Sequence, residues 1–216
     1  MSDMTVYGIP GSPFLRAVEV TLKEKGADYR LQAMSPAEMK TPDHLAIHPF
    51  GRIPMFERDD FCLYETQAII RYLDEVFPNP PLTPGNPEQR ARMNQIIGII
   101  EWYFFPKAAA PIAFNRIIGP KLLGLPSDEA AIADALPMAR ICFAELDRLL
   151  GDKPYLTGDN VSIADIMLAA QVDVLNETPE GHELISGTRL EAWLGRMRSR
   201  PSFIATEPPA MFRKAA

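Results

Sequence analysis

Apolar residues change their spacing between the first third of the chain and the remainder. In the first third, short apolar runs at 4–8, 29–33, 55–58 and 61–64 are separated by polar or breaker-rich stretches, which is typical of β-strands. After residue 88, apolar positions recur at helical spacing only. The pattern therefore predicts an α/β domain followed by an all-helical domain.

The order of elements in the first third predicts a thioredoxin-like fold. A helix beginning at Pro13 separates the first two strands, which then pair in parallel through a right-handed crossover. The strands at 55–58 and 61–64 are joined by two residues and form an antiparallel hairpin. A helix with apolar positions from Ala68 to Phe77 follows, and we expect helices on both faces of the sheet.

A proline-rich stretch marks the expected domain boundary. The division is a thioredoxin-like domain at 1–78, a linker at 79–88 and an all-helical domain at 89–216. Ser162 and Asp165 precede an apolar helix as a capping box, and we interpret them as a folding signal rather than a catalytic pair. The expected helices of the second domain are 88–105, 109–123, 128–150, 163–175 and 189–199.

Composition and charge exclude several classes of function. With 216 residues, 47% of them hydrophobic, the chain can bury a sizeable core, which excludes disorder as its main state. A net charge of -6 without a basic cluster argues against nucleic acid and membranes as partners. The amino terminus lacks an apolar signal segment, and Glu101 interrupts the most apolar stretch, so we expect a cytoplasmic protein.

Neither the cysteines nor the histidines have the spacing of a metal site. Cys62 and Cys142 lie far apart in the sequence, and we expect both to be plain buried thiols. His44, His48 and His182 do not combine with cysteine or aspartate in a ligand pattern. No metal is therefore expected.

Residues 51–56, Gly-Arg-Ile-Pro-Met-Phe, carry a candidate binding site. Pro54 stands where a strand begins, and the bond before it is a candidate cis peptide. The backbone N–H and C=O of Ile53 then point outward, where an extended peptide can pair with them as a short added strand. The alternative interpretation is that Pro54 only ends a loop.

Glu65 and Thr66 are expected to begin the helix that follows the hairpin. The free N–H groups and positive dipole of a helix start, together with the Thr66 hydroxyl, favour an anion. Glu65 can accept a hydrogen bond from an amine. With Ile53, these residues predict a docking site for a small peptide, and the alternative is that they only cap the helix.

Three segments resemble the phi-type glutathione transferases, and the resemblance spans nearly the whole chain. Residues 8–16 match the family pattern G-x-P-x-S-x-x-x-R, residues 38–45 resemble E-H-K-x-P-E-x-L, and residues 48–54 resemble N-P-F-G-Q-I-P. The chain resembles a serine-type, theta-related family member from bacteria or fungi. It implies the glutathione transferase fold, with glutathione as co-substrate.

The resemblance implies a role for individual residues. Ser12 falls on the catalytic serine, whose hydroxyl donates to the glutathione thiolate, although from the residues alone it is a helix cap. Tyr7 lies before the turn and ranks second as a donor. Met39 replaces a family histidine and Arg52 a glutamine, which bears on glutathione affinity rather than on chemistry. The implied glutathione-binding residues are Lys40, Arg52, Ile53, Pro54, Glu65 and Thr66.

The implied activity is that of a glutathione S-transferase whose thiolate attacks a small hydrophobic electrophile. The electrophile pocket is expected to form between the Ser12 loop and the first helices of the second domain. Alternatives are a transferase-like binding or scaffold protein and a glutathione-dependent peroxidase or isomerase. An aromatic stripe is more often part of a core than of a pocket. The candidates for the pocket wall are Phe14, Trp102, Tyr103, Phe104, Phe105 and Phe114.

The family resemblance also implies a homodimer. Phe50 follows His48 and Pro49 in a breaker-rich loop, where a large apolar side chain has little local core to enter. It is expected either to plug a pocket of the partner or to be buried in its own domain.

Overall fold

A mixed four-stranded sheet organises the first part of the computed structural model, which describes residues 4–210. The strand order is β2-β1-β3-β4. Strand β1 (Met4–Gly8) runs parallel to β2 (Arg30–Ala33) and antiparallel to β3 (Met55–Arg58), which forms a hairpin with β4 (Phe61–Tyr64). The predicted thioredoxin-like order of strands is therefore confirmed.

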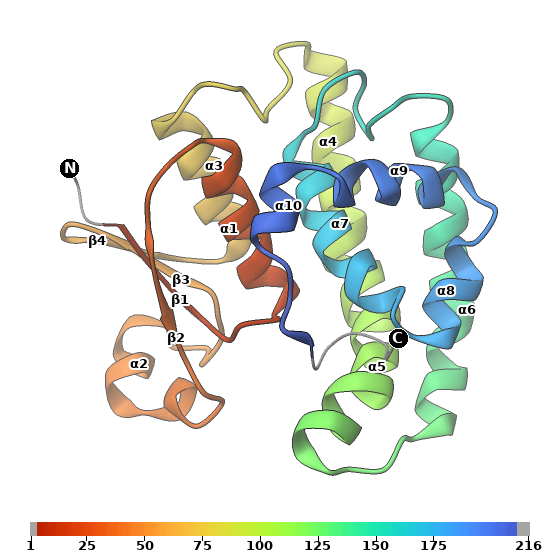
Figure 1. The fold of residues 1–216 in the computed structure, drawn as a ribbon, viewed down its shortest axis with the longest axis horizontal. Coiled ribbons are helices and arrows are strands. Elements are labelled where there is room, and N and C mark those ends of the chain that lie inside the picture. The colour runs from red at the N-terminus through yellow and green to blue at the C-terminus, as the bar shows by residue number, and fades with distance from the viewer. Residues whose placement is uncertain (1–3, 211–216) are drawn as a thin grey trace. The chain divides into compact units, whose positions relative to one another are not determined.

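One face of the sheet is apolar and carries two helices. Helices α1 (Pro13–Glu24) and α3 (Thr66–Val76) pack against each other beside the sheet (Figure 1). Val6 of β1 is fully buried. Gly8, on the same face, allows α1 to approach, because a Cβ there would lie 3.0 Å from a side-chain atom of Leu15.

The opposite face of the sheet carries polar side chains. Tyr7 donates its hydroxyl hydrogen to Glu57 Oε2 at 2.6 Å, and Cys62 lies opposite Glu57 in the neighbouring strand. Cys62 is exposed, so the prediction of a buried thiol was wrong at this position, because β4 is an edge strand and Cys62 is on its solvent side. The same prediction is confirmed for Cys142, which is buried.

The connector between β2 and β3 contains two short helical elements. They are the 3-10 helix η1 (Glu38–Lys40) and helix α2 (Pro42–Ile47). Thr41 and Pro42 begin α2, because the threonine side chain accepts the His44 N–H and proline suits the first helical position. The expected irregular or helical connection is thus largely helical.

The chain forms two compact units, and the first one includes a segment from near the carboxyl terminus. Residues up to Pro81 belong to the first unit together with Pro201–Pro208, whereas Leu82–Arg200 belong to the second. The expected division placed the whole of 89–216 in the helical domain. Contacts between segments distant in sequence decide this assignment, and no local pattern reports them.

Helix α10 (Pro201–Ala205) contacts α1 near both ends of α1. Arg16 donates to the Phe203 carbonyl oxygen at 3.2 Å, and its guanidinium lies 4.6 Å from the centre of the Phe203 ring. Ser202 donates to Glu24 at 2.5 Å. These contacts fix the position of α1 and of the turn before α1.

The regular elements in the described part of the second unit are helices, and the first of them merge into one run. The run Pro87–Leu123 comprises α4, η2, α5 and η3, where two separate helices were predicted. The π-helical segments η2 and η3 contain Pro106 and Pro120, and their wider turns accommodate rings that would clash in a regular α-helix. The bounds are α4 (Pro87–Ile99), η2 (Ile100–Ala109), α5 (Ala110–Ala113), η3 (Phe114–Leu123), α6 (Glu129–Leu150), α7 (Ile163–Leu175), α8 (Pro179–Ile185) and α9 (Arg189–Arg198).

By length and composition alone, the run Pro87–Leu123 is apolar enough to cross a membrane. The core helix of a helical domain passes the same test. Segment η2 packs against α6 and α7, and its Phe104 is fully buried, edge-on to Phe143 with ring centres 5.5 Å apart. Part of the run, around Phe104, is therefore packed in the core of the second unit.

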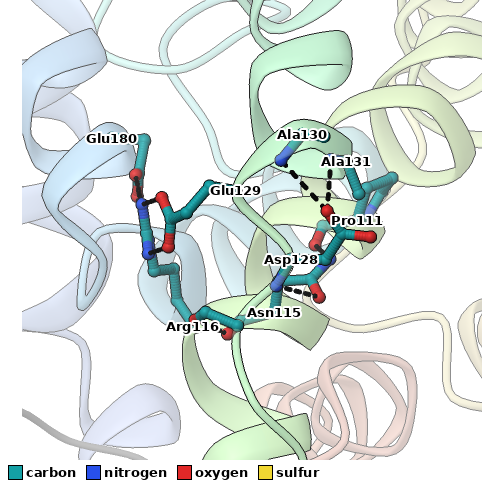
Figure 2. A network of polar contacts seen from close by, with 9 residues as sticks. Pro111, Asn115, Arg116, Asp128, Glu129, Ala130, Ala131 and Glu180 are labelled. Atoms are coloured by element: carbon teal, nitrogen blue, oxygen red, sulfur yellow. Dashed lines mark hydrogen bonds and ion pairs between the residues drawn. The ribbon is translucent and has the colours of Figure 1, made fainter.

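A polar network ties η3 to the starts of α6 and α8 (Figure 2). Arg116 of η3 forms ion pairs with Glu129 and Glu180, each with an N–O distance of 2.5 Å. Beside it, Asn115 accepts the Asp128 N–H at 3.2 Å, and Asp128 in turn caps α6. Charged side chains in this unit are thus used to join its helices.

Candidate functional site

Ser12 lies in the turn between β1 and α1, where its hydroxyl can still donate a hydrogen bond. Gly11 before it has a φ of +94°, a conformation that favours glycine. Ser12 is the N-cap of α1, but its Oγ accepts the Leu15 N–H only at 3.5 Å, which is long. Within residues 4–210 no group accepts the Ser12 hydroxyl hydrogen.

Tyr7 is engaged on the polar face of the sheet. Its hydrogen bond to Glu57, with burial and the charge of Glu57 adding to it, raises the pKa of Tyr7 to about 12. A phenol that already donates to a carboxylate is poorly suited to donate to sulfur. Tyr7 is therefore a weaker candidate than Ser12.

The Ile53-Pro54 peptide bond is cis, as predicted. Strand β3 begins at Met55, which lies opposite Tyr7 at the end of the β1-β3 ladder. Neither the N–H nor the C=O of Ile53 has a hydrogen-bond partner in the described part of the chain. Both groups are available to an extended peptide.

Glu65 and Thr66 stand at the start of α3, as predicted. Glu65 has a φ of +73°, a region that costs a non-glycine residue about 1–3 kcal/mol. Its exposed side chain neither caps the helix nor forms an ion pair among the described residues. A strained residue with an uncommitted carboxylate points to a ligand rather than to helix capping.

Lys40 and Arg52 present exposed cationic side chains. Lys40 ends η1, and Arg52 lies in the loop before Ile53. Neither side chain forms a hydrogen bond or ion pair between residues 4 and 210. Met39, beside Lys40, is half-buried and offers no charge to an anion.

The strand pairings bring three of these segments to one edge of the sheet. Tyr7 lies opposite Met55, and Met55 lies opposite Tyr64. Three chain segments therefore lie at the same edge of the sheet. They are the end of β1 that leads to Ser12, the start of β3 that follows Pro54 and the end of β4 that leads to Glu65. The sequence predicts each segment separately, but only the register of the sheet brings them together.

His44 and His48 were considered from the sequence only as metal ligands, yet both support this edge. His44 Nε2 lies 2.9 Å from the Arg52 carbonyl oxygen, and His48 stacks on Tyr64 with ring centres 4.4 Å apart. Burial lowers the pKa of His48. Their spacing of four residues, one helical turn, was a signal that they lie on one side of the chain.

The candidate electrophile contacts differ in exposure. Trp102 is 72% exposed, Phe114 is exposed to a lesser degree, and Phe105 and Phe14 are half-buried. Phe104, by contrast, belongs to the core of the second unit and is removed from the set of wall candidates. No group of three metal-ligating side chains occurs within residues 4–210.

Family models match both parts of the chain. The model of the glutathione S-transferase N-terminal domain matches residues 2–75, and that of the C-terminal domain matches residues 129–196. A probable glutathione S-transferase from Oryza sativa subsp. japonica is 30% identical over 204 residues, which cover 94% of each chain.

Solved structures agree with these matches. A glutathione transferase from Populus trichocarpa has a TM-score of 0.85 at 29% identity, covering 94% of this chain and 97% of its own. A glutathione S-transferase-I bound with lactoylglutathione has a TM-score of 0.83 at 28% identity, covering 94% and 98%. Oryza sativa and Populus trichocarpa are both plants, which corrects the expected likeness to bacterial or fungal members.

Proposed function

Because this chain belongs to the glutathione S-transferase family, we propose that it is a phi-type-like, serine-type enzyme that joins glutathione to a small hydrophobic electrophile. The observation that carries the proposal is Ser12. Its hydroxyl lies at the start of α1, in a segment that matches the family pattern, and it is only weakly engaged by its own helix.

In this proposal Ser12 stabilises the glutathione thiolate. The thiol proton passes to solvent, and the Ser12 hydroxyl then donates a hydrogen bond to the sulfur, aided by the positive end of α1. The thiolate forms a bond to the electrophilic carbon. In a substitution the leaving group departs with its electron pair, and in a conjugate addition the acceptor takes a proton from solvent.

The remaining candidates orient glutathione. The N–H and C=O of Ile53, next to Pro54, pair with its backbone as an added strand. Glu65 accepts from the amine of the γ-glutamyl end, while Thr66 and the start of α3 hold the carboxylate beside it. We assign the glycyl carboxylate to Lys40 and Arg52, and the electrophile to Phe14, Trp102, Phe105 and Phe114.

We further propose that the protein is a cytoplasmic homodimer. Phe50 is 69% exposed, which supports its role as an apolar plug for the partner subunit. A single sedimenting species near the mass of one chain, 24.1 kDa, at micromolar concentration would exclude this proposal.

Replacing Ser12 by alanine tests the central assignment. Loss of a single donor to developing negative charge is expected to lower kcat/KM for a generic electrophile by about 10²–10³ at neutral pH. Activity should recover partly at alkaline pH, where the bound thiol ionises without help. The matched variant Ser12→Thr, which keeps a hydroxyl, should retain more activity than the alanine variant.

Three results would contradict the proposed role of Ser12 or favour a different function for the chain. Activity of Ser12→Ala equal to that of the parent would show that Ser12 is not the donor. Glutathione binding without turnover of any electrophile would favour a binding or scaffold protein. Turnover of peroxides or isomerisable substrates in place of electrophiles would favour the glutathione-dependent peroxidase or isomerase.

A further inference from the structure

His44 supports the loop that carries one set of proposed glutathione contacts. Its ring is buried, and its Nε2 lies 2.9 Å from the carbonyl oxygen of Arg52. A carbonyl oxygen can only accept, so Nε2 carries the hydrogen and donates. The bond fixes the peptide that joins Arg52 to Ile53, whose backbone is proposed to pair with glutathione.

His48 supports the second set of contacts. It is 1% exposed, and its ring stacks on Tyr64, the residue before Glu65, with ring centres 4.4 Å and planes 23° apart. Phe50 packs edge-on to His48 with ring centres 6.2 Å apart. The buried Nδ1 of His48 has no hydrogen-bond partner among the described residues.

The groups around His48 favour its neutral form. Burial lowers its pKa most, and the charges of His44 on α2 and Arg52 in the loop lower it further. Glu65 at the start of α3 acts in the opposite direction without reversing the shift. Tyr64 on β4 contributes its ring as a neutral stacking surface.

On the basis of the glutathione site proposed above, we propose that His44 and His48 are positioning residues for the Arg52-Ile53 and Tyr64-Glu65 segments, and that His48 holds its segment in the binding geometry only while its ring is uncharged. His44 acts through a hydrogen bond and His48 through stacking. Neither ring touches glutathione in this proposal.

Protonation of His48 would disturb both segments. It would add an N–H without an acceptor at the buried Nδ1 and a positive charge close to His44, whose ring centre is 5.8 Å away. Because the pKa of His48 is lowered on folding, its neutral contribution is complete above about pH 6.5 and is lost as the pH falls through the lower folded value. Glutathione affinity should therefore fall with the pH.

The test is calorimetric titration of glutathione at about pH 7.5 and about pH 5.5, a range in which its own carboxylates, amine and thiol change little. The dissociation constant of the parent should rise at the lower pH, by at most about tenfold per pH unit for one linked proton. His48→Asn, which restores the residue of the family pattern and does not titrate, should abolish this dependence.

A second pair of variants tests the role of His44. His44→Ala should weaken binding by about two- to tenfold at the higher pH, because the Arg52 carbonyl loses its donor. His44→Gln keeps an N–H donor and should recover most of this loss. In steady-state kinetics both effects should appear in KM for glutathione and leave kcat nearly unchanged.

His182 provides the matched control, because it is the third histidine of the chain and is exposed on α8. His182→Asn should keep the pH dependence of the parent. A dissociation constant of the parent that is constant or falls at the lower pH, or an unchanged slope in His48→Asn, would overturn the positioning role.

If the parent binds no glutathione at about pH 7.5, the proposed function fails first, and the positioning role is then judged without ligand. Hydrogen exchange of amides in 50–56 and 64–66, corrected for intrinsic rates, should show lost protection at about pH 5.5 in the parent but not in His48→Asn. Equal protection in the two proteins would overturn the positioning role by itself.

Discussion

Hydroxyl and carboxylate side chains stand at the start of α7 in the second unit and at the starts of α1 and α3 in the first unit. Within the described residues, they are fully hydrogen-bonded at α7 and largely without hydrogen bonds at α1 and α3. At α7, the Asp165 carboxylate accepts hydrogen bonds from the Leu156 N–H, the Ser162 N–H and hydroxyl, and Trp193 Nε1, at 2.6–2.9 Å. Burial raises the pKa of Asp165 and these donors oppose the shift. The predicted capping box is therefore confirmed as part of the folded core.

The α1 and α3 starts leave polar groups unused. The Ser12 side chain contacts its helix only at 3.5 Å, and among the described residues the Glu65 side chain makes no capping contact although its backbone is strained. A saturated cap has no donor or acceptor left for a ligand, whereas an unsaturated one does. The comparison thus separates residues that serve folding from residues that are available for binding.

Disrupting the saturated cap should have the largest effect. In Ser162→Ala/Asp165→Ala, the Leu156 N–H and the Trp193 indole lose a buried acceptor, and each such loss costs about 1–3 kcal/mol. With the lost cap added, we expect the free energy of unfolding to fall by about 4 kcal/mol. Urea denaturation measures this, and glutathione affinity of the folded fraction should stay unchanged.

Disrupting the unsaturated cap should have the opposite profile. Glu65→Ala/Thr66→Ala removes charge-assisted contacts to glutathione, so affinity should fall by at least about tenfold, while stability falls by about one capping interaction. Glu65→Gly is the sharper variant, because glycine tolerates the positive φ. It should bind glutathione weakly yet unfold at the same temperature as the parent or higher.

Calorimetric titrations and thermal melts on the same protein samples would decide between the two caps. If the Glu65/Thr66 and Ser162/Asp165 variants lost stability equally and the first kept its affinity, the docking site would be rejected.

The smallest effect is expected at the Arg116 network of Figure 2, in which the Glu129 side chain is exposed. Hydrogen bonds from Arg116 lower the pKa of Glu129, and at Glu180 they outweigh the opposing effect of burial and lower its pKa as well. Both carboxylates therefore contribute stability above about pH 4.5, which is lost as the pH falls through their lower folded values.

Arg116→Ala should accordingly lower the melting temperature by about 2–4 °C at neutral pH. The difference from the parent should shrink as the pH falls below about 4. Thermal melts at several pH values measure this, with Arg140→Ala as control, because within the described residues Arg140 forms an exposed ion pair with Glu183 only. A constant difference at every pH would show that Arg116 acts through packing.

Local patterns were sufficient for the elements on which the candidate site depends. The hairpin between β3 and β4, the cis bond before Pro54 and the start of α3 at Thr66 were all predicted. Each depends on residues within a few positions of one another, so propensity and capping determine it. Ser12 was found in the same way, from a cap and a family pattern.

Features that depend on distant contacts were missed. The exposure of Cys62 follows from the edge position of β4, and the return of α10 to the first unit follows from Phe203 and Ser202 meeting α1. The run Pro87–Leu123 stays continuous because it packs against α6 and α7. This packing outweighs the tendency of the prolines to break a helix.

The sequence by itself determined the order of strands and helices in the first unit up to α3, the caps at Ser12 and Ser162 and the chemistry of each candidate residue, because these depend on short-range spacing. Only the tertiary structure decided which of them meet. The sheet register brings the Ser12, Pro54 and Glu65 segments to one edge, and the folding of the connector buries His48 against Tyr64. Register and burial are set by the free energy of packing the whole unit, which no short segment encodes.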